Sequence, residues 1–144
     1  MLFRSQGAVD DARITCKVDT GRALAVAGLH PATGGSGAEL CSGDMLLEAL
    51  VACAGVTLKA VATSLGIHLR KAAVRAEGDL DFRGTLGVDR EAPVGFREIR
   101  LTFALETDAK EEELASLLKL TERYCVVYQT LKQGTPCRTS VDLQ

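Results

Sequence analysis

The sequence predicts an α+β fold in which antiparallel strands pack against helices. Residues 74–83 and 98–105 alternate apolar and polar side chains, which is the period of a strand with one buried face. The segment from Met45 to Leu65 is apolar without this alternation and is long enough for a buried helix. Three consecutive glutamates follow Thr107-Asp108, as is typical of the start of a second helix.

The size and charge of the chain limit its class. With 144 residues it fits one domain, which we predict to span residues 1–144. A net charge of −2 provides no basic surface for nucleic acid or an anionic membrane, and an aromatic content of 4% provides no stacking platform for bases. We therefore expect neither a nucleic-acid partner nor a membrane partner.

The cysteine content indicates free thiols. The chain has five cysteines at irregular spacing, and no basic-then-apolar signal follows Met1. This combination favours a reducing compartment over a disulfide framework, so we expect a cytoplasmic protein. The sequence contains no CxxC pair and no histidine cluster, and we expect no metal and no cofactor.

The apolar segment is the predicted central helix. It begins near Ser42 or Asp44, and Gly66 follows its end. Only Glu48 and Lys59 are charged between residues 45 and 65, so nearly every face is apolar and we expect burial on all sides. The length also suits a membrane span, but the polar positions and charged neighbours favour a core helix.

The remaining elements are shorter. Two β-prone runs, at residues 12–18 and 22–26, precede a glycine-containing loop at residues 28–43. The second helix is expected to reach Tyr124, where β-branched residues interrupt or restart it. Residues 137–143 alternate again and predict a final strand.

Cys53 and Cys125 are the candidate reactive residues. Thiol peroxide chemistry requires one sulfur to attack the oxidant and another to resolve the product. The alternative is that Cys53, among small apolar neighbours, only fills the core. Its position inside a helix gives it no helix N-terminus, so we expect its thiolate to need an outside cation. Cys125 is better placed to ionise if a new helix begins there, because its thiolate would then face the positive end of the helix dipole. Cys41, His30 and His68 show no such pattern, and we expect them to be incidental or surface residues.

Two motifs resemble those of the OsmC/Ohr family, the osmotically inducible and organic hydroperoxide resistance proteins. Residues 42–53, SGDMLLEALVAC, are similar to the family form P-x-E-L-L-L-x-A-L-x-x-C. Residues 122–131, ERYCVVYQTL, are similar to E-x-x-C-P-V-x-x-T-L. The hairpin and the closing strand follow in matching order, so the resemblance covers essentially the whole chain.

The resemblance implies a fold, a partner and an activity. It implies an OsmC-like fold, with an antiparallel sheet on a long buried central helix and an intertwined homodimer. Cys53 would be the peroxidatic sulfur for an organic hydroperoxide and Cys125 the resolving sulfur. Asp44 matches the glutamate of the family most closely and is a candidate catalytic residue. An external dithiol, in some members a lipoylated protein, would restore both thiols.

The sequence also departs from the family pattern. Ser42 and Val126 stand where the two motifs commonly have proline. Active family members use an upstream arginine to hold the thiolate, yet residues 23–69 contain none, which leaves Arg22 and Arg13 as candidates. We therefore expect a divergent member that acts as a thiol-dependent peroxidase in oxidative-stress defence. The alternative is a non-enzymatic dimer that binds a small apolar ligand or senses oxidants.

Overall fold

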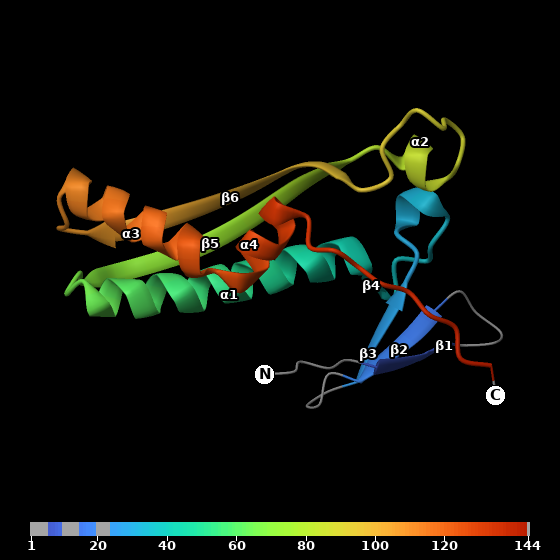
Figure 1. Cartoon of the computed structure of the whole chain (residues 1–144), viewed down its shortest axis with the longest axis horizontal. Coiled ribbons are helices and arrows are strands. Elements are labelled where there is room, and N and C mark those ends of the chain that lie inside the picture. Colours follow the sequence, from blue (N-terminus) through green and yellow to red (C-terminus); the bar gives the residue numbers. More distant parts are fainter. Residues whose placement is uncertain (1–5, 10–14, 20–23, 144) are drawn as a thin grey trace. The chain divides into compact units, whose positions relative to one another are not determined.

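The computed structural model describes residues 6–9, 15–19 and 24–143 and confirms a mixed α+β chain (Figure 1). The chain divides into two compact units. The first unit comprises residues 1–48 and 76–100, and the second comprises residues 49–75 and 101–144. Helix α1 and strands β5 and β6 contribute residues to both units.

The first unit contains a four-stranded sheet with the order β1-β2-β3-β4. Its strands are β1 (Gln6–Val9), β2 (Thr15–Asp19), β3 (Leu24–Gly28) and β4 (Leu40–Cys41). β1 pairs with β2 and β2 with β3 in antiparallel fashion, whereas β3 and β4 are parallel. The predicted strands correspond to β2 and β3, except that residues 12–14 and 22–23 lie outside the described part of the chain. β1 was not predicted. A 3-10 turn (Pro31–Thr33) precedes β4.

Helix α1 (Ser42–Ser64) is the predicted central helix, and it ends before Gly66, whose φ of +69° is in the left-handed region that favours glycine. One face of α1 is buried, formed by Leu50, Ala54, Leu58, Val61 and Ala62. On the opposite face Val56 is 73% exposed, so a single chain covers only part of this helix. By length and composition α1 could cross a membrane, a property that core helices of soluble proteins share.

Strands β5 (Leu69–Leu80) and β6 (Phe96–Thr107) form a two-stranded sheet (Figure 1). Two cross-strand ion pairs, Arg70 with Glu106 and Arg100 with Asp79, show that the strands are antiparallel. Both strands are longer than the predicted runs. A single-turn helix, α2 (Phe82–Thr85), begins the connection between them.

The core of the second unit joins α1 to helix α3 (Glu111–Tyr124). Leu58, Val61 and Ala62 of α1 pack with Ile67 and Leu117. Partly buried residues from β5, β6, α3 and the connection between β6 and α3 surround this cluster, namely Leu69, Phe103, Leu105, Ala109, Leu114 and Leu120. Burial of this apolar surface holds the end of α1 against the sheet and against α3.

Helix α3 begins after Thr107 and Asp108, the residues at which the sequence suggested a helix start. Thr107 belongs to β6, where its hydroxyl donates to the carbonyl of His68 at 2.7 Å. The N-cap is Lys110, whose N–H donates to a carboxylate oxygen of Glu113 at 2.8 Å. α3 ends at Tyr124, and a separate helix, α4 (Val126–Gln133), follows after Cys125.

The predicted final strand is wrong. After Gly134, which ends α4 at a φ of +62°, residues 135–143 form neither strand nor helix and are exposed. In the described part of the chain no strand pairs with this segment, so its backbone lacks the ladder partners that a strand requires. Cys137 is accordingly exposed.

We predict that Leu117→Ala lowers the free energy of unfolding by about 2–5 kcal/mol, because it opens a cavity beneath a side chain that is 0% exposed. Urea denaturation measures the loss. Leu143→Ala is the control, since Leu143 is 90% exposed and should change stability by less than about 0.5 kcal/mol. Equal effects of the two substitutions would refute the assigned core.

Candidate functional site

The structure brings Cys53 and Cys125 together. Cys53 lies in the middle of α1 and is half-buried, whereas Cys125 lies between α3 and α4 and is 0% exposed. Both residues belong to the second unit. Each thiol shifts the pKa of the other, so the two side chains are neighbours, and both are free thiols.

The backbone around Cys125 explains how α4 comes to face the sulfurs. Cys125 is extended (φ −73°, ψ 107°) and is the N-cap of α4. Its N–H still donates to the carbonyl of Thr121 in α3 at 3.0 Å, and its carbonyl accepts the first hydrogen bond of α4, from Gln129, at 2.9 Å. The N–H groups of residues 126–128 therefore have no acceptor within the helix.

The amides at the start of α4 influence both thiols. Hydrogen bonding from the amides of Val127 and Val126 lowers the pKa of Cys53, and hydrogen bonding from the amides of Tyr128 and Val127 lowers that of Cys125 against the effect of burial. The positive end of the α4 dipole thus lies at the thiol pair.

The two thiols differ in acidity. Burial raises the pKa of Cys53, but hydrogen bonds from the amides of Val127 and Val126 and from the Cys125 thiol outweigh this effect, and the pKa lies below its ordinary value. Burial raises the pKa of Cys125, and donation of its proton to Cys53 raises it further. Cys53 is therefore the sulfur that ionises first, and Cys125 is the one that keeps its proton.

This arrangement corrects the expectation for the two cysteines. The sequence indicated that a helix N-terminus would help Cys125 and that Cys53 would depend on a cation. A new helix does begin after Cys125, but the thiol whose pKa its first amides bring below the ordinary value is Cys53, whereas the pKa of Cys125 stays raised. The one signal in the sequence was Val126 in place of a proline, since proline has no N–H to donate.

Thr57 is a further neighbour of Cys53 that sequence analysis did not single out. It lies one turn later in α1, and its hydroxyl donates to the carbonyl of Cys53 at 2.8 Å. The same hydroxyl is within hydrogen-bonding reach of the Cys53 sulfur, where it also lowers the pKa of that thiol. With a single proton, it can serve the carbonyl or the sulfur but not both at once.

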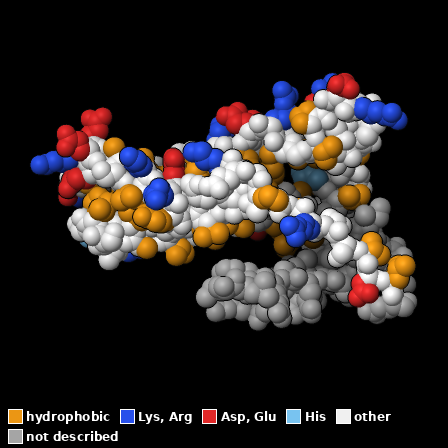
Figure 2. Space-filling view, in the orientation of Figure 1, with side chains coloured by type: hydrophobic (Ala, Val, Ile, Leu, Met, Phe, Trp, Pro, Cys, Tyr) orange, Lys and Arg blue, Asp and Glu red, His pale blue; other side chains and the backbone are white. Residues whose placement is uncertain are grey.

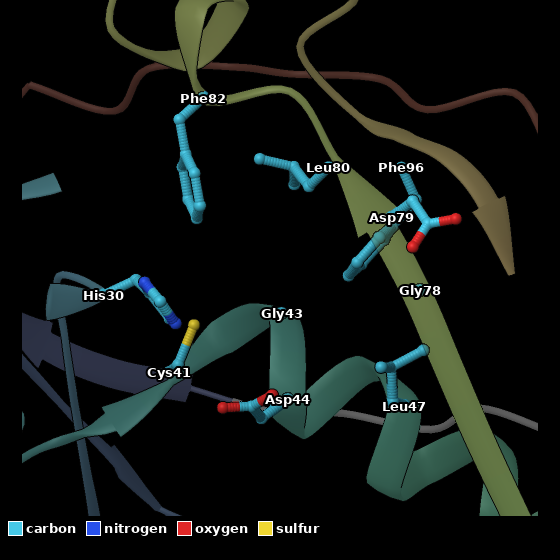
Figure 3. A pocket seen from close by; sticks show the side chains of 10 residues that line it. All are labelled: His30, Cys41, Gly43, Asp44, Leu47, Gly78, Asp79, Leu80, Phe82 and Phe96. Carbon is cyan, nitrogen blue, oxygen red and sulfur yellow. The ribbon is translucent and has the colours of Figure 1, made fainter. Parts of the chain in front are cut away.

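Asp44 lies elsewhere, two and a half turns before Cys53 in α1. It lines a cavity of about 400 Å³ in the first unit (Figure 3). Leu47, Leu80, Phe82 and Phe96 supply most of the apolar wall. A catalytic role for Asp44 stays a prediction, because the groups that contact the Cys53 sulfur come from α4 and from Thr57.

His30 and Cys41 form the polar side of the same cavity, where their side chains point toward each other (Figure 3). The imidazole stacks on Phe82 at a centroid distance of 5.2 Å, and its Nδ1 accepts the N–H of Ala32 at 3.1 Å. Both residues thus line a cavity, whereas the sequence indicated incidental or surface positions.

The remaining predicted groups are not placed. Arg13 and Arg22, the candidate cations, lie outside the described residues. Within the described residues, no group of three or more His, Cys, Asp or Glu side chains is arranged to hold a metal ion.

Comparison with known proteins identifies the class. The family model for OsmC-like proteins matches residues 35–140, and the chain belongs to this family. No curated protein matches at a significant level.

Several solved structures share the fold. An OsmC-like protein from Mycoplasma pneumoniae is 17% identical, with a TM-score of 0.74 over 92% of this chain and 88% of that chain. An organic hydroperoxide resistance protein OsmC from Legionella pneumophila is 16% identical, with a TM-score of 0.70 over 92% and 91%. The organic hydroperoxide resistance protein OhrB of Bacillus subtilis is 19% identical, with a TM-score of 0.60 over 92% and 93%. At these identities the likeness extends to the fold.

We predict that alkylation distinguishes the two thiols by pH. Because the pKa of Cys53 is lowered, its thiolate persists to lower pH, and its reaction with iodoacetamide is lost only as the pH falls through that lowered value. The reaction of Cys125 requires a higher pH because its pKa is raised. Peptide mass spectrometry across a pH series gives both midpoints, with exposed Cys137 as an accessible reference thiol. A lower midpoint for Cys125 than for Cys53 would contradict the assignment.

Proposed function

We propose that the protein is a thiol-dependent peroxidase that reduces organic hydroperoxides, with Cys53 as the peroxidatic and Cys125 as the resolving residue. The observation that carries the proposal is the neighbouring pair of free thiols, in which the pKa of Cys53 is lowered and the pKa of Cys125 is raised. Membership of the OsmC-like family supports it. So do the structural neighbours from Legionella and Bacillus, whose names refer to organic hydroperoxide resistance.

The reaction divides into three balanced steps. The Cys53 thiolate attacks the terminal oxygen of the hydroperoxide, the O–O bond breaks, and the alkoxide takes up a proton to leave as an alcohol, with Cys53 oxidised to a sulfenic acid. The Cys125 thiol then attacks that sulfur, water leaves, and a Cys53–Cys125 disulfide forms. An external dithiol, for which a lipoylated protein is a candidate, reduces the disulfide and is itself oxidised to a disulfide.

The exposure of the two sulfurs matches these roles. Cys53 is half-buried and reachable, whereas Cys125 is buried beside it and waits for the sulfenic acid. Exposed apolar residues of α1 lie on both sides of Cys53, namely Ala49, Ala52 and Val56. Such a surface suits an alkyl hydroperoxide better than hydrogen peroxide, because it offers apolar contact and few hydrogen-bonding groups. The proposal places the protein in the cytoplasm, where reducing thiol systems regenerate the pair.

We further propose a homodimer in which a second copy covers the exposed face of α1. Figure 2 shows hydrophobic side chains along the edge that α1 forms, and Val56 is 73% exposed there. Alanines on this face, Ala49, Ala52 and Ala60, allow close approach of another helix. An apolar stripe of this length on a helix is normally buried against another element.

A second candidate function follows from the cavity of about 400 Å³ in the first unit. Its apolar wall favours the binding of a small apolar ligand without catalysis. In that case lipophilic ligands should raise the melting temperature of Cys53→Ser as much as that of the unsubstituted protein. If the protein consumes no peroxide and the ligands stabilise both forms equally, the results would favour ligand binding over peroxidase activity as the function.

We predict that tert-butyl hydroperoxide consumes both thiols in step and leaves a Cys53–Cys125 disulfide in mass spectrometry. Cys53→Ser should abolish peroxide reduction, because the attacking sulfur is lost. Cys125→Ser should stop at a sulfenic acid on Cys53 that dimedone traps. Cys137→Ser is the matched control and should retain the unsubstituted rate, since Cys137 is exposed and outside the pair. Undiminished peroxide reduction by Cys53→Ser would eliminate the proposed mechanism.

For the dimer, sedimentation equilibrium should give twice the mass of the 15.3 kDa chain. Val56→Glu should produce a monomer, because it places a charge on the proposed interface. Val88→Glu is the control, since Val88 is similarly exposed (75%) but lies between β5 and β6 and not on α1. A monomeric unsubstituted protein at micromolar concentration would refute the dimer.

A further inference from the structure

We infer that the cavity of about 400 Å³ in the first unit binds a small molecule that has an aromatic body and a protonated amine. The inference goes beyond the proposed peroxidase, because Cys53 and Cys125 do not line this cavity. It gives the ligand of the second candidate function a chemical class and a charge. The size of the cavity, its aromatic wall and the charges around it support this ligand.

The cavity is large enough for such a molecule and is built within one unit. Residues of α1, β5 and β6 and of the segments around β4 and α2 line it, and all of them belong to the first unit. Its volume of about 400 Å³ lies in the range of roughly 300–1,000 Å³ that is usual for small-molecule sites. Because this volume is near the lower end of the range, it suits a ligand with one aromatic ring and a short chain.

Aromatic rings that are held in place form part of the wall. The ring of Phe96 lies against the backbone of Gly78 in the neighbouring strand, where a methyl group would lie only 2.7 Å from the ring. The ring of Phe82 stacks on His30 at a centroid distance of 5.2 Å (Figure 3). Aromatic rings pack well against another ring and attract a cation to their faces. The wall therefore favours an aromatic body, and a positive charge over a negative one.

The charged side chains that line the cavity are negative. They are Asp44 and Asp79, and among the described residues no lysine or arginine lines it. Arg100 compensates the charge of Asp79, because it donates to both carboxylate oxygens, at 2.5 and 3.0 Å. Asp44 forms no ion pair within the described part of the chain. Its carboxylate is therefore the charge that a ligand can neutralise.

The start of α1 offsets this charge only in part. Gly43 and Asp44 lie in the first turn of α1, and the N-terminus of a helix is equivalent to about half a positive charge. That is less than the full negative charge of the carboxylate, so this end of the cavity stays negative. An amine would pair with Asp44 there, whereas an anionic group would be repelled by it.

His30 adds no positive charge to the cavity. Its Nδ1 accepts the N–H of Ala32 at 3.1 Å, so this nitrogen carries no proton and the neutral ring holds its proton on Nε2. Cys41, toward which the ring points, is a free thiol (Figure 3). An amine therefore meets no cationic side chain among the described residues of the wall.

The test uses three ligands that share an aromatic body and differ in charge, namely phenethylamine, phenethyl alcohol and phenylacetate. Isothermal titration calorimetry on the whole chain measures their affinities. An exposed ion pair and a cation near an aromatic ring each contribute modestly, so the amine should bind about fivefold more tightly than the alcohol. Phenylacetate should bind most weakly, because Asp44 repels it. Equal affinities for the amine and the alcohol, a preference for phenylacetate, or no binding at all would overturn the inference.

Two matched variants locate the amine. Asp44→Asn removes the charge and keeps the size of the side chain, so it should abolish the preference for the amine and leave the affinity for phenethyl alcohol unchanged. Glu48→Gln is the control, since Glu48 lies one turn later in α1, is exposed and does not line the cavity. It should retain the preference. A preference that survives in Asp44→Asn would show that the amine binds elsewhere and would overturn the inference.

Cys41 is a reporter in the unsubstituted protein, which keeps the test decisive should Asp44→Asn unfold. It lines the cavity, whereas Cys137 is exposed and does not. Bound phenethylamine should slow the alkylation of Cys41 by iodoacetamide at neutral pH and leave that of Cys137 unchanged, as peptide mass spectrometry measures. Phenethyl alcohol at the same concentration should protect Cys41 less. Alkylation of Cys41 that the amine does not slow would overturn the inference.

These measurements separate the inference from the proposed function, because none of them involves peroxide. Loss of amine binding leaves the peroxidase proposal standing. A protein that binds the amine and consumes no peroxide would refute the peroxidase alone.

Discussion

The structure of the site depends on one feature of the backbone, the extended conformation of Cys125 between two helices. It ends α3, begins α4 and leaves the amides of residues 126–128 without helical acceptors. Because α4 begins directly after this break, its first amides lie where they lower the pKa of Cys53. A continuous helix through Cys125 would pair these amides internally and remove the donors from Cys53.

The same feature makes the two cysteines unequal. A buried pair of thiols has no intrinsic order of ionisation, and two neighbouring thiolates repel each other. Hydrogen bonding from the amides of Val127 and Val126 and from the Cys125 thiol lowers the pKa of Cys53, and burial raises the pKa of Cys125. The asymmetry is what a dithiol mechanism requires, since the attacking sulfur must be charged and the resolving sulfur must not compete for the oxidant.

The distribution of apolar surface connects this site to assembly. The face of α1 that carries Leu50, Ala54 and Leu58 completes the core, while the face that carries Val56 is left open. Cys53 lies between these two faces, so a second copy on the open face would also enclose the sulfur. Exclusion of water at that point would strengthen the hydrogen bonds to the thiolate. Oligomerisation and thiol chemistry are thus coupled in the proposal through one helix.

The sequence by itself determined the α+β class, the extent of α1 and the antiparallel pair β5 and β6, because these follow from local periodicity or from a capping residue. It also indicated the break after Tyr124, through the β-branched residues that follow. It did not determine the final strand, whose alternation at residues 137–143 finds no pairing partner in the described chain, since a strand depends on a neighbour. It also did not determine which cysteine the helix N-terminus serves. That choice depends on how α4 packs against the middle of α1, and only the tertiary structure decides it.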